Sequence, residues 1–333
     1  MIENKLFQRA IREDDRAFRC PISKDMLAKD EKGYHSKKLH NTYLFHDGIP
    51  DFAQASINDT PKEDIQLFWD NCPNESIKSE AVIGSHEYYR QTEQNRFDIH
   101  LDFSKPFLKD AIQYDSVQGK KILEIGCGIG LDAIQFARSG NEMYLLDLSL
   151  NSMKIALGRF QSEGYKAVPC IGDSENLPFG DNSFDMVYSY GVIHHSPDTE
   201  KSIDEIHRVL KPGGQAIIML YSKWSANTLF RTLFHNGLLK GEIFRLGSIR
   251  KVLSNWTELQ SKTDSSVNPM TRVFSFRKIR KMLRAFESVE LEKHFINRYQ
   301  MAEFRLILRF IPEKAKMNLH KYLGWNTIIK AKK

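Results

Sequence analysis

The chain has 333 residues, of which 41% are hydrophobic, 27% charged and 11% aromatic, as in ordinary globular proteins. This apolar content excludes disorder as the dominant state, and no apolar run approaches the roughly 18 residues that cross a bilayer. The N-terminal segment MIENKLFQRAIREDD is charged throughout, and no two of the four cysteines form a C-x-x-C pair. We therefore expect a cytoplasmic protein in a reducing compartment, without a disulfide framework.

The net charge of +6 is unevenly distributed along the chain. Residues 270–333 hold 16 Lys and Arg against 5 Asp and Glu, a local balance of +11, so the first 269 residues carry −5. This basic end is either a solvated face of the fold or a surface for an acidic partner, such as a phosphorylated substrate, anionic lipid or nucleic acid.

The middle of the chain alternates apolar strand-like runs with amphipathic helical stretches. The strand-like runs are 120–126, 142–148, 166–172, 183–191 and 215–221, and the helical stretches are 131–140, 151–163 and 198–211. This alternation is typical of βαβ units with a parallel sheet covered on both faces. Farther on, 274–286 is amphipathic, and 288–299 and 324–333 are the expected sixth and seventh strands, the seventh antiparallel.

A glycine-rich turn, Gly126-Cys127-Gly128-Ile129-Gly130, follows the first strand and opens a helix. Glycines there let a ligand approach the backbone, and the free N–H groups of the helix start attract a carboxylate or a phosphate. Leu131 stands where a dinucleotide-binding turn would have its third glycine. Asp147 ends the second strand, 21 residues after Gly126, where a carboxylate accepts hydrogen bonds from a ribose.

Together, the motifs LEIGCGIG, Asp147, GDSENLPF, FDMVYSYGVIHHSPD and EIHRVLKPGGQAIIM resemble those of the class I S-adenosylmethionine-dependent methyltransferases. Within that superfamily they are similar to the branch that includes the ubiquinone/menaquinone-biosynthesis enzymes. The resemblance covers about residues 105–221. It implies a Rossmann-like, doubly wound α/β fold with a seven-stranded sheet in the order 3-2-1-4-5-7-6. It also implies S-adenosyl-L-methionine as cofactor and S-adenosyl-L-homocysteine as product.

The resemblance also implies roles for individual residues. Tyr190 would lie near the sulfonium, and Cys127 would be a small space-filling residue in the loop. The other implied cofactor contacts are Glu124, Gly126, Gly128 and Gly130 at the methionine part, Asp147 at the ribose, Leu148 and Ser149 beside the adenine, and Asp173 and Ser174 at the adenine edge.

Two adjacent histidines, His194 and His195, follow the fourth strand at the edge where open α/β sheets bind ligands. Either could deprotonate a hydroxyl or amine acceptor, or both could brace the loop over the cofactor. Because no Asp, Asn and His set has metal-binding spacing around this edge, we expect methyl transfer without a metal ion.

The residues before the predicted core are expected to form two further parts of the protein. Residues 1–60 resemble a small zinc-ribbon module, but its four ligand positions hold Cys20, Ser23, Ser36 and Leu39. We therefore expect a metal-free module, the alternative being a site that combines Cys20 with His35, His40 or His46. Residues 61–118 would be a linker and pocket-covering helices, in which Tyr88, Tyr89 and Arg96 either contact the methionine carboxylate or the acceptor, or only pack.

Residues 119–333 would form the methyltransferase domain, with insertions at 222–270 and 300–323 as an acceptor lid. Aromatic residues of the first insertion either line that lid or belong to the core: Trp224, Phe230, Phe234, His235 and Trp256.

The function that these features favour is methyl transfer to O, N or C of a small-molecule acceptor. The alternatives are methylation of RNA or protein through the basic C-terminal face, and a non-catalytic S-adenosylmethionine-binding protein. Ser189-Tyr190-Gly191 is not the amine-methylation signature of base N-methyltransferases, which argues against the usual N-methylation of a nucleic-acid base. Leu131 disfavours a nicotinamide-dependent oxidoreductase. The sequence does not predict the acceptor or the oligomeric state.

Overall fold

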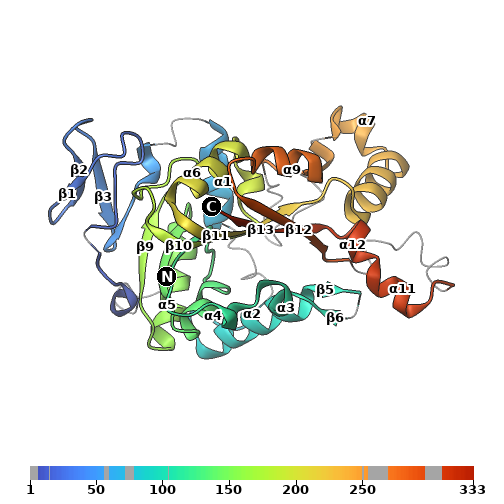
Figure 1. The fold of residues 1–333 in the computed structure, drawn as a ribbon, viewed down its shortest axis with the longest axis horizontal. Helices are drawn as coiled ribbons and strands as arrows, with labels where there is room; N and C mark the ends of the chain where they lie inside the picture. The colour runs from blue at the N-terminus through green and yellow to red at the C-terminus, as the bar shows by residue number, and fades with distance from the viewer. Residues whose placement is uncertain are drawn as a thin grey trace.

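Seven strands form one mostly parallel sheet in the order β12-β13-β11-β10-β7-β8-β9 (Figure 1). The computed structural model describes residues 7–14, 16–55, 60–71, 79–103, 105–249, 251–253, 269–296 and 310–333. The strands of the sheet are β7 (Lys121–Ile125), β8 (Glu142–Asp147), β9 (Ala167–Ile171), β10 (Phe184–Tyr190), β11 (Leu210–Tyr221), β12 (Ser288–His294) and β13 (Asn326–Lys332). With β7 counted as the first strand, this is the predicted order 3-2-1-4-5-7-6.

Strand direction also follows the prediction. β7 pairs in parallel with β8 on one side and with β10 on the other. β13 runs antiparallel to both β11 and β12, so Ile329 faces Ile218 on one side and Leu291 on the other. Because buried parallel strands are covered on both faces, their sequences are nearly continuous apolar runs.

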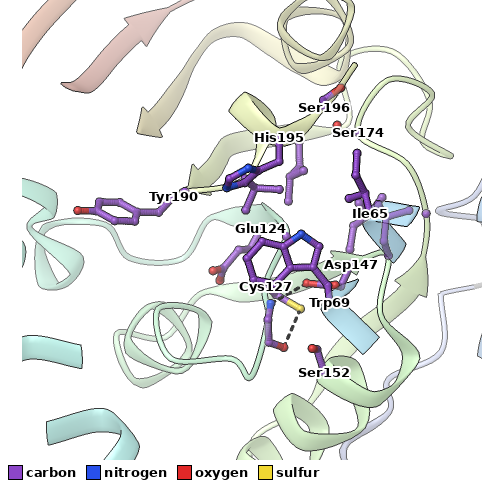
Figure 2. Close-up of a pocket in the computed structure, with 18 of the residues that line it drawn as sticks. Ile65, Trp69, Glu124, Cys127, Asp147, Ser152, Ser174, Tyr190, His195 and Ser196 are labelled. Carbon is purple, nitrogen blue, oxygen red and sulfur yellow. Dashed lines mark hydrogen bonds between the residues drawn. The ribbon is translucent and has the colours of Figure 1, made fainter. Parts of the chain in front are cut away.

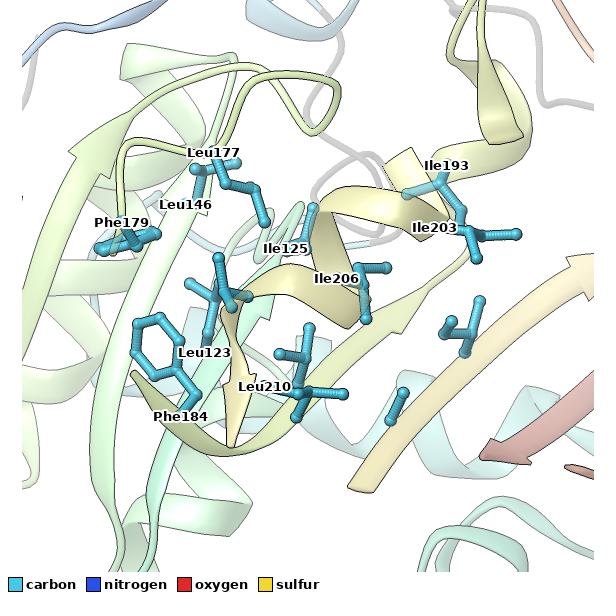
Figure 3. Packing of buried hydrophobic residues seen from close by; sticks show 14 of the residues in the cluster. Leu123, Ile125, Leu146, Leu177, Phe179, Phe184, Ile193, Ile203, Ile206 and Leu210 are labelled. Atoms are coloured by element: carbon cyan, nitrogen blue, oxygen red, sulfur yellow. The ribbon is translucent and has the colours of Figure 1, made fainter. Parts of the chain in front are cut away.

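Successive side chains of β7 point to opposite faces of the sheet and belong to two hydrophobic cores, one on each face. Leu123 and Ile125 join the core that contains Phe184 and Ile206 (Figure 3). Ile122 joins the other core. The helices after the strands are α4 (Ala133–Arg138), α5 (Leu150–Ser162) and α6 (Thr199–Val209), and α9 (Phe276–Met282) precedes β12.

Helix starts are fixed by side-chain caps. Ser149 caps α5 by accepting a hydrogen bond from the Ser152 N–H at 3.0 Å, and Asp198 caps α6 through the Lys201 N–H at 3.0 Å. Each cap satisfies a backbone donor that the helix itself leaves unpaired. These starts place the helix N-termini at the carboxyl edge of the sheet.

The N-terminal segment forms a small separate sheet of β1 (Leu27–Lys29), β2 (Gly33–Ser36), β3 (Thr42–His46) and β4 (Ile49–Pro50). Its strand β4 contacts β9, and the N-terminal segment bridges to the edge of β9 at Asp51–Ile171 and Ile11–Ala167, while Phe18 pairs with Phe179 beyond the end of β9. The rings of Phe18 and Phe179 are 5.5 Å apart. The small sheet therefore covers an edge that would otherwise expose unpaired backbone groups.

The four predicted ligand positions of this module lie in a corner whose polar groups bond to one another. Cys20 Sγ lies 3.1 Å from the Tyr43 hydroxyl and accepts the Ser23 N–H at 3.4 Å. The Ser36 hydroxyl donates to Asp25 at 3.3 Å, and Leu39 packs against the main hydrophobic core. Hydrogen bonds and packing therefore connect these four positions with their neighbours.

The remaining described helices flank this body. On the N-terminal side they are α1 (Thr60–Asn71), α2 (His86–Ile99) and α3 (Leu108–Ile112), with the short strands β5 (Leu101–Asp102) and β6 (Lys105–Pro106). On the C-terminal side they are the π-helix η6 (Asn227–Leu239) and the α-helices α7 (Glu242–Leu246), α11 (Glu313–Asn318) and α12 (His320–Leu323). Within the described ranges, no helix combines the length and the apolar character that a membrane span requires.

We expect protein purified without chelators to contain no stoichiometric zinc, because Ser and Leu do not replace cysteine as zinc ligands. Elemental analysis of the full chain measures this. As a matched control, the triple variant Ser23→Cys, Ser36→Cys, Leu39→Cys restores four thiols and should capture about one zinc per chain. One equivalent of zinc in the unmodified protein would contradict the prediction.

Candidate active site

A cavity opens at the carboxyl ends of β7, β8 and β10 (Figure 2). The space around it, counting its open mouth, is about 1070 Å³. Open α/β sheets bind ligands at this position because the chain leaves the central strand in opposite directions on its two sides.

The floor of the cavity is the bend after β7. Gly126 and Gly128 have φ values of +70° and +51°, in the left-handed region that favours glycine. A Cβ at position 126 would lie 2.3 Å from Val192 Cγ2, whereas a Cβ at Gly128 would meet nothing within 4 Å. Gly126 is therefore needed for packing, and the absent side chain of Gly128 leaves room for a ligand.

The buried carboxylate of Asp147 lies beside this bend. Its oxygens accept the Gly128 N–H at 2.7 Å and the Ser149 N–H at 2.9 Å. Burial raises the pKa of Asp147 to about 6, although both backbone donors lower it. The carboxylate thus holds the bend against the end of β8 and retains lone pairs for further donors.

Glu124, at the end of β7, is a second buried carboxylate in the wall. Its Oε2 has no hydrogen-bond partner among the described residues. Burial raises the pKa of Glu124 well above its usual value, and the nearby Asp132 adds to the effect. A buried polar atom of this kind is costly unless a ligand or water satisfies it.

The other acidic residues of the cavity are paired with cations. Lys62 Nζ lies 2.6 Å from Asp173 and 2.7 Å from Glu175. Arg96 pairs with Asp132 at 2.5 Å. Within the described part of the chain, Glu124 and Asp147 form no ion pair, so neither of these buried carboxyl groups has a cation of the protein bound to it.

Helix α1 forms one wall of the cavity through Lys62, Ile65 and Trp69 (Figure 2). It is held there by the Gln66 side chain, which donates to the Leu148 carbonyl at 3.0 Å, and by Asp70, which accepts the Ser149 hydroxyl at 2.6 Å. The sequence predicted a linker and pocket-covering helices over 61–118 but named only Tyr88, Tyr89 and Arg96 there, so the lining residues of α1 were missed. The signal for a helix start was present, since Pro61 follows Thr60, but nothing local indicated the contact with the cavity.

Most of the predicted cofactor residues line this one cavity. They are Arg96, Glu124, Gly126, Cys127, Gly128, Asp147, Leu148, Asp173, Ser174 and Tyr190. Residues that the sequence predicted at the ends of four different strands and on α2 therefore lie around the same cavity.

Four predicted site residues do not line the cavity. Gly130 faces Ala156, whose Cβ lies 3.0 Å from where a Gly130 Cβ would be. Ser149 is the cap of α5 and bonds to Asp70. Tyr89 packs beside Ile155 and donates its hydroxyl to that residue's carbonyl at 3.3 Å, and its neighbour Tyr88 packs in the same cluster. The fourth is His194.

The two histidines occupy different environments. His194 is fully buried with its ring 3.9 Å from that of Tyr221, and burial lowers its pKa well below the usual value. His195 lines the cavity opposite Trp69 (Figure 2). Its Nδ1 lies 2.7 Å from the Met270 carbonyl oxygen, which can only accept, so Nδ1 carries the proton. In the neutral ring, Nε2 is then the basic nitrogen.

Two of the lining residues already form hydrogen bonds with other residues of the protein. Asp173 accepts hydrogen bonds from Lys62, the Asn176 side chain and the Glu175 N–H. The Tyr190 hydroxyl accepts from Asn326 at 2.7 Å, and its ring lies 4.6 Å from the Arg96 guanidinium carbon. Asp173 thus differs from the free carboxylate expected at the adenine edge.

The aromatic residues predicted for an acceptor lid do not line the cavity within the described residues. Trp224 and Phe234 are 54% and 42% exposed, and Phe230 and His235 are half-buried. Trp256 lies outside the described residues.

A cluster of Asp102, His294 and His320 lies outside the cavity, with potential ligand atoms within 4.8 Å of one another. His294 Nδ1 donates to Asp102 at 2.8 Å, while the two imidazole rings stack at an interplanar angle of 9°. Parallel stacked rings do not direct two lone pairs at one point. This geometry favours a hydrogen-bonded junction between β5, β12 and α12 over a metal site.

Comparison with known proteins identifies the core. Residues 123–218 match the family model described as a methyltransferase domain. This part of the chain is thus similar to a methyltransferase domain. The cavity described above lies at its strand ends, and S-adenosyl-L-methionine is its expected methyl donor.

The names of proteins similar to this part of the chain refer to different methyl acceptors. Phosphoethanolamine N-methyltransferase 2 of Caenorhabditis elegans is 43% identical over 111 residues, which are 33% of this chain and 25% of that protein. A demethylmenaquinone methyltransferase of Geobacillus kaustophilus is 34% identical over 153 residues, 44% of this chain and 62% of that one. The corresponding enzyme of Renibacterium salmoninarum is 27% identical over 189 residues, 56% and 70% of the two chains.

The matches to the first and second of these relatives thus span less than two thirds of their lengths. Among solved structures, a SAM-dependent methyltransferase from Thermotoga maritima is 18% identical with a TM-score of 0.47, covering 80% of this chain and 99% of that one.

Gly128→Ala should leave the fold intact but weaken S-adenosylmethionine binding about tenfold or more, because the new methyl group enters the cavity. The left-handed conformation costs alanine roughly 1–2 kcal/mol of stability. Gly140→Ala is the matched control, since Gly140 has a φ of +80°, is exposed, and would place a Cβ where nothing lies within 4 Å. Calorimetric titration of both variants checks this, and equal binding by the two would refute it.

Proposed function

We propose that the chain transfers a methyl group from S-adenosyl-L-methionine to O, N or C of a small-molecule acceptor. One observation supports this choice of cofactor most directly. Glu124 and Asp147 are buried carboxylates without ion pairs among the described residues, and they face a cavity whose floor is open at Gly128. Such a cavity favours a ligand that brings positive charge and hydroxyl donors.

The same charge balance argues against a dinucleotide. S-adenosylmethionine carries a sulfonium and an ammonium group against one carboxylate, whereas a nicotinamide dinucleotide carries a pyrophosphate. An ionised Glu124 beside the glycine bend would repel that pyrophosphate, whereas Asp147 suits the ribose of either ligand. The charge and the departure at Leu131 thus favour the same ligand.

Different residues would contact different parts of the cofactor. Asp147 would accept the ribose hydroxyls, and Glu124 would accept the ammonium group through its unsatisfied oxygen. The backbone at Gly128 would lie against the amino-acid part, and Tyr190 would lie near the sulfonium. When bound, the cofactor supplies an electrophilic methyl group, so the protein's task is mainly to align the acceptor with it.

We assign the role of general base, where the acceptor needs one, to His195. Its proton is fixed on Nδ1 by the Met270 carbonyl, and the residue lines the cavity. His194 is enclosed by Tyr221 and by His195 itself. With its depressed pKa and no cavity surface, His194 would brace the loop.

For the chain as a whole we propose three parts. Residues 1–60 would be a degenerate ribbon-like module, 61–118 a linker with covering helices, and 119–333 the catalytic domain. Support comes from the separate four-stranded sheet at the edge of β9 and from the contacts of α1 with the cavity.

Isothermal titration of the full chain against S-adenosylmethionine, S-adenosylhomocysteine and NAD tests the proposed function. The two sulfur compounds should bind at least about a hundredfold more tightly than NAD, as expected for several charge-assisted hydrogen bonds. Binding of NAD alone would overturn the proposal. Mass spectrometry of co-purified ligands then addresses the acceptor.

Asp147→Ala should weaken cofactor binding by ~1.5–3 kcal/mol, the cost of losing charge-assisted bonds. The raised pKa of Asp147, about 6, gives a second signature. Ribose hydroxyls donate to the ionised form, so affinity should be full above this pKa and fall as the pH drops from about 7.5 to about 5. Asp147→Asn should flatten that dependence. An unchanged pH profile in this variant would assign the titration to another group.

A further inference from the structure

Large hydrophobic side chains are exposed mainly on the C-terminal side of the molecule. Among the described residues, eight of the fourteen such side chains follow residue 223. Five of them belong to η6, α7 and the residues just beyond, which we call the η6–α7 unit (227–249): Phe234, Leu238, Leu239, Phe244 and Ile249, with exposed fractions from 42% to 80%.

The η6–α7 unit is packed internally but leaves these side chains in solvent. Its two helices contact each other at Gly237, where a Cβ would lie 2.8 Å from Ile243 Cδ1. Figure 1 places α7 at the end of the molecule opposite the N-terminal sheet. Neither the active-site cavity nor the two main cores use the exposed residues. Exposed apolar groups that gather in one place mark an interaction surface.

The same segment is rich in exposed basic residues. Residues 222–253 contain six Lys and Arg but only one acidic residue, Glu242. Arg231, Lys240, Arg245 and Lys251 are exposed, and Arg245 pairs with Glu242 at 2.7 Å. The partner must therefore offer both negative charge and an apolar phase.

We propose that the η6–α7 unit docks on an anionic membrane surface. Lys and Arg beside exposed Phe and Leu are the composition of interfacial helices, which bury the apolar groups at the headgroup boundary while the cations face anionic lipids. A nucleic acid would satisfy the cations but not Leu238, Leu239 and Ile249, because phosphates and sugars offer aliphatic groups no apolar phase. This inference does not depend on the proposed function, since the surface is separate from the cavity.

Flotation of the full chain with vesicles tests the proposal. Vesicles of phosphatidylcholine with about one-third phosphatidylglycerol should bind the protein roughly tenfold or more tightly than vesicles of phosphatidylcholine alone, and added salt should reduce the difference. The pairs Leu239→Ser with Phe244→Ser and Lys240→Glu with Lys251→Glu should each weaken binding to the anionic vesicles about tenfold or more.

Met26→Ser with Val82→Ser is the matched control, because these side chains are 64% and 79% exposed but lie outside the η6–α7 unit. The control should bind vesicles as the unmodified protein does, and all variants should bind S-adenosylmethionine equally, which separates this test from that of the proposed function. Absence of binding to anionic vesicles would overturn the inference. A dimer that the Leu239 and Phe244 changes dissociate would assign the surface to a second copy instead, and RNA binding abolished by the same changes would assign it to nucleic acid.

Discussion

The central position of β7 is the constraint on which the site depends. β7 pairs in parallel with β8 and with β10, so the chain proceeds toward β9 on one side and returns on the other to build β10 and β11. The loops after β7 and β10 consequently separate above the sheet and leave the cavity between them. The bend after Ile125 must then fit between Val192 and the Asp147 carboxylate, and only a residue without a Cβ fits at Gly126.

Much of this arrangement follows from local sequence. Buried parallel strands need unbroken apolar runs, and tight turns at a ligand need glycine, so the strands and the bend were predictable from 120–221 together with the two late strands. The order of the strands, in contrast, was implied only by the family resemblance. The start of β11 was not predictable. The sequence predicted a helix over 198–211 and a strand from 215, yet α6 already ends at Val209 and β11 begins at Leu210, so that Pro212, Gly213 and Gly214 lie within the strand. Those glycines belong to the strand because Gly213 and Gly214 bond to the backbone of Lys333, a contact between residues far apart in the sequence.

The parts that sequence reasoning missed are all contacts of this kind. Lys62 meets Asp173 across more than a hundred positions, and no motif in TPKEDIQLFWDN specifies such a contact. Arg159 is fully buried and donates to the carbonyls of Ile129 and Tyr89. Tyr89 was consequently misplaced: its spacing fits a pocket-facing helix as well as a packed one, and the buried Arg159 lies against its ring. Periodicity reports which face of a helix is covered, but not whether protein or ligand covers it.

The pairing of some carboxylates and not others gives the cavity its chemical character. Lys62 and Arg96 pair with Asp173, Glu175 and Asp132, which leaves Glu124 and Asp147 as the acids of the cavity without an ion pair among the described residues. Burial disfavours ionisation of both groups and raises the pKa of each. A ligand with a cation and hydroxyl donors would stabilise their ionised forms and satisfy their buried oxygens. Because Lys62 lies on α1, the helix that covers the cavity also helps to leave these two groups, beside the glycine bend, as the acids available to such a ligand.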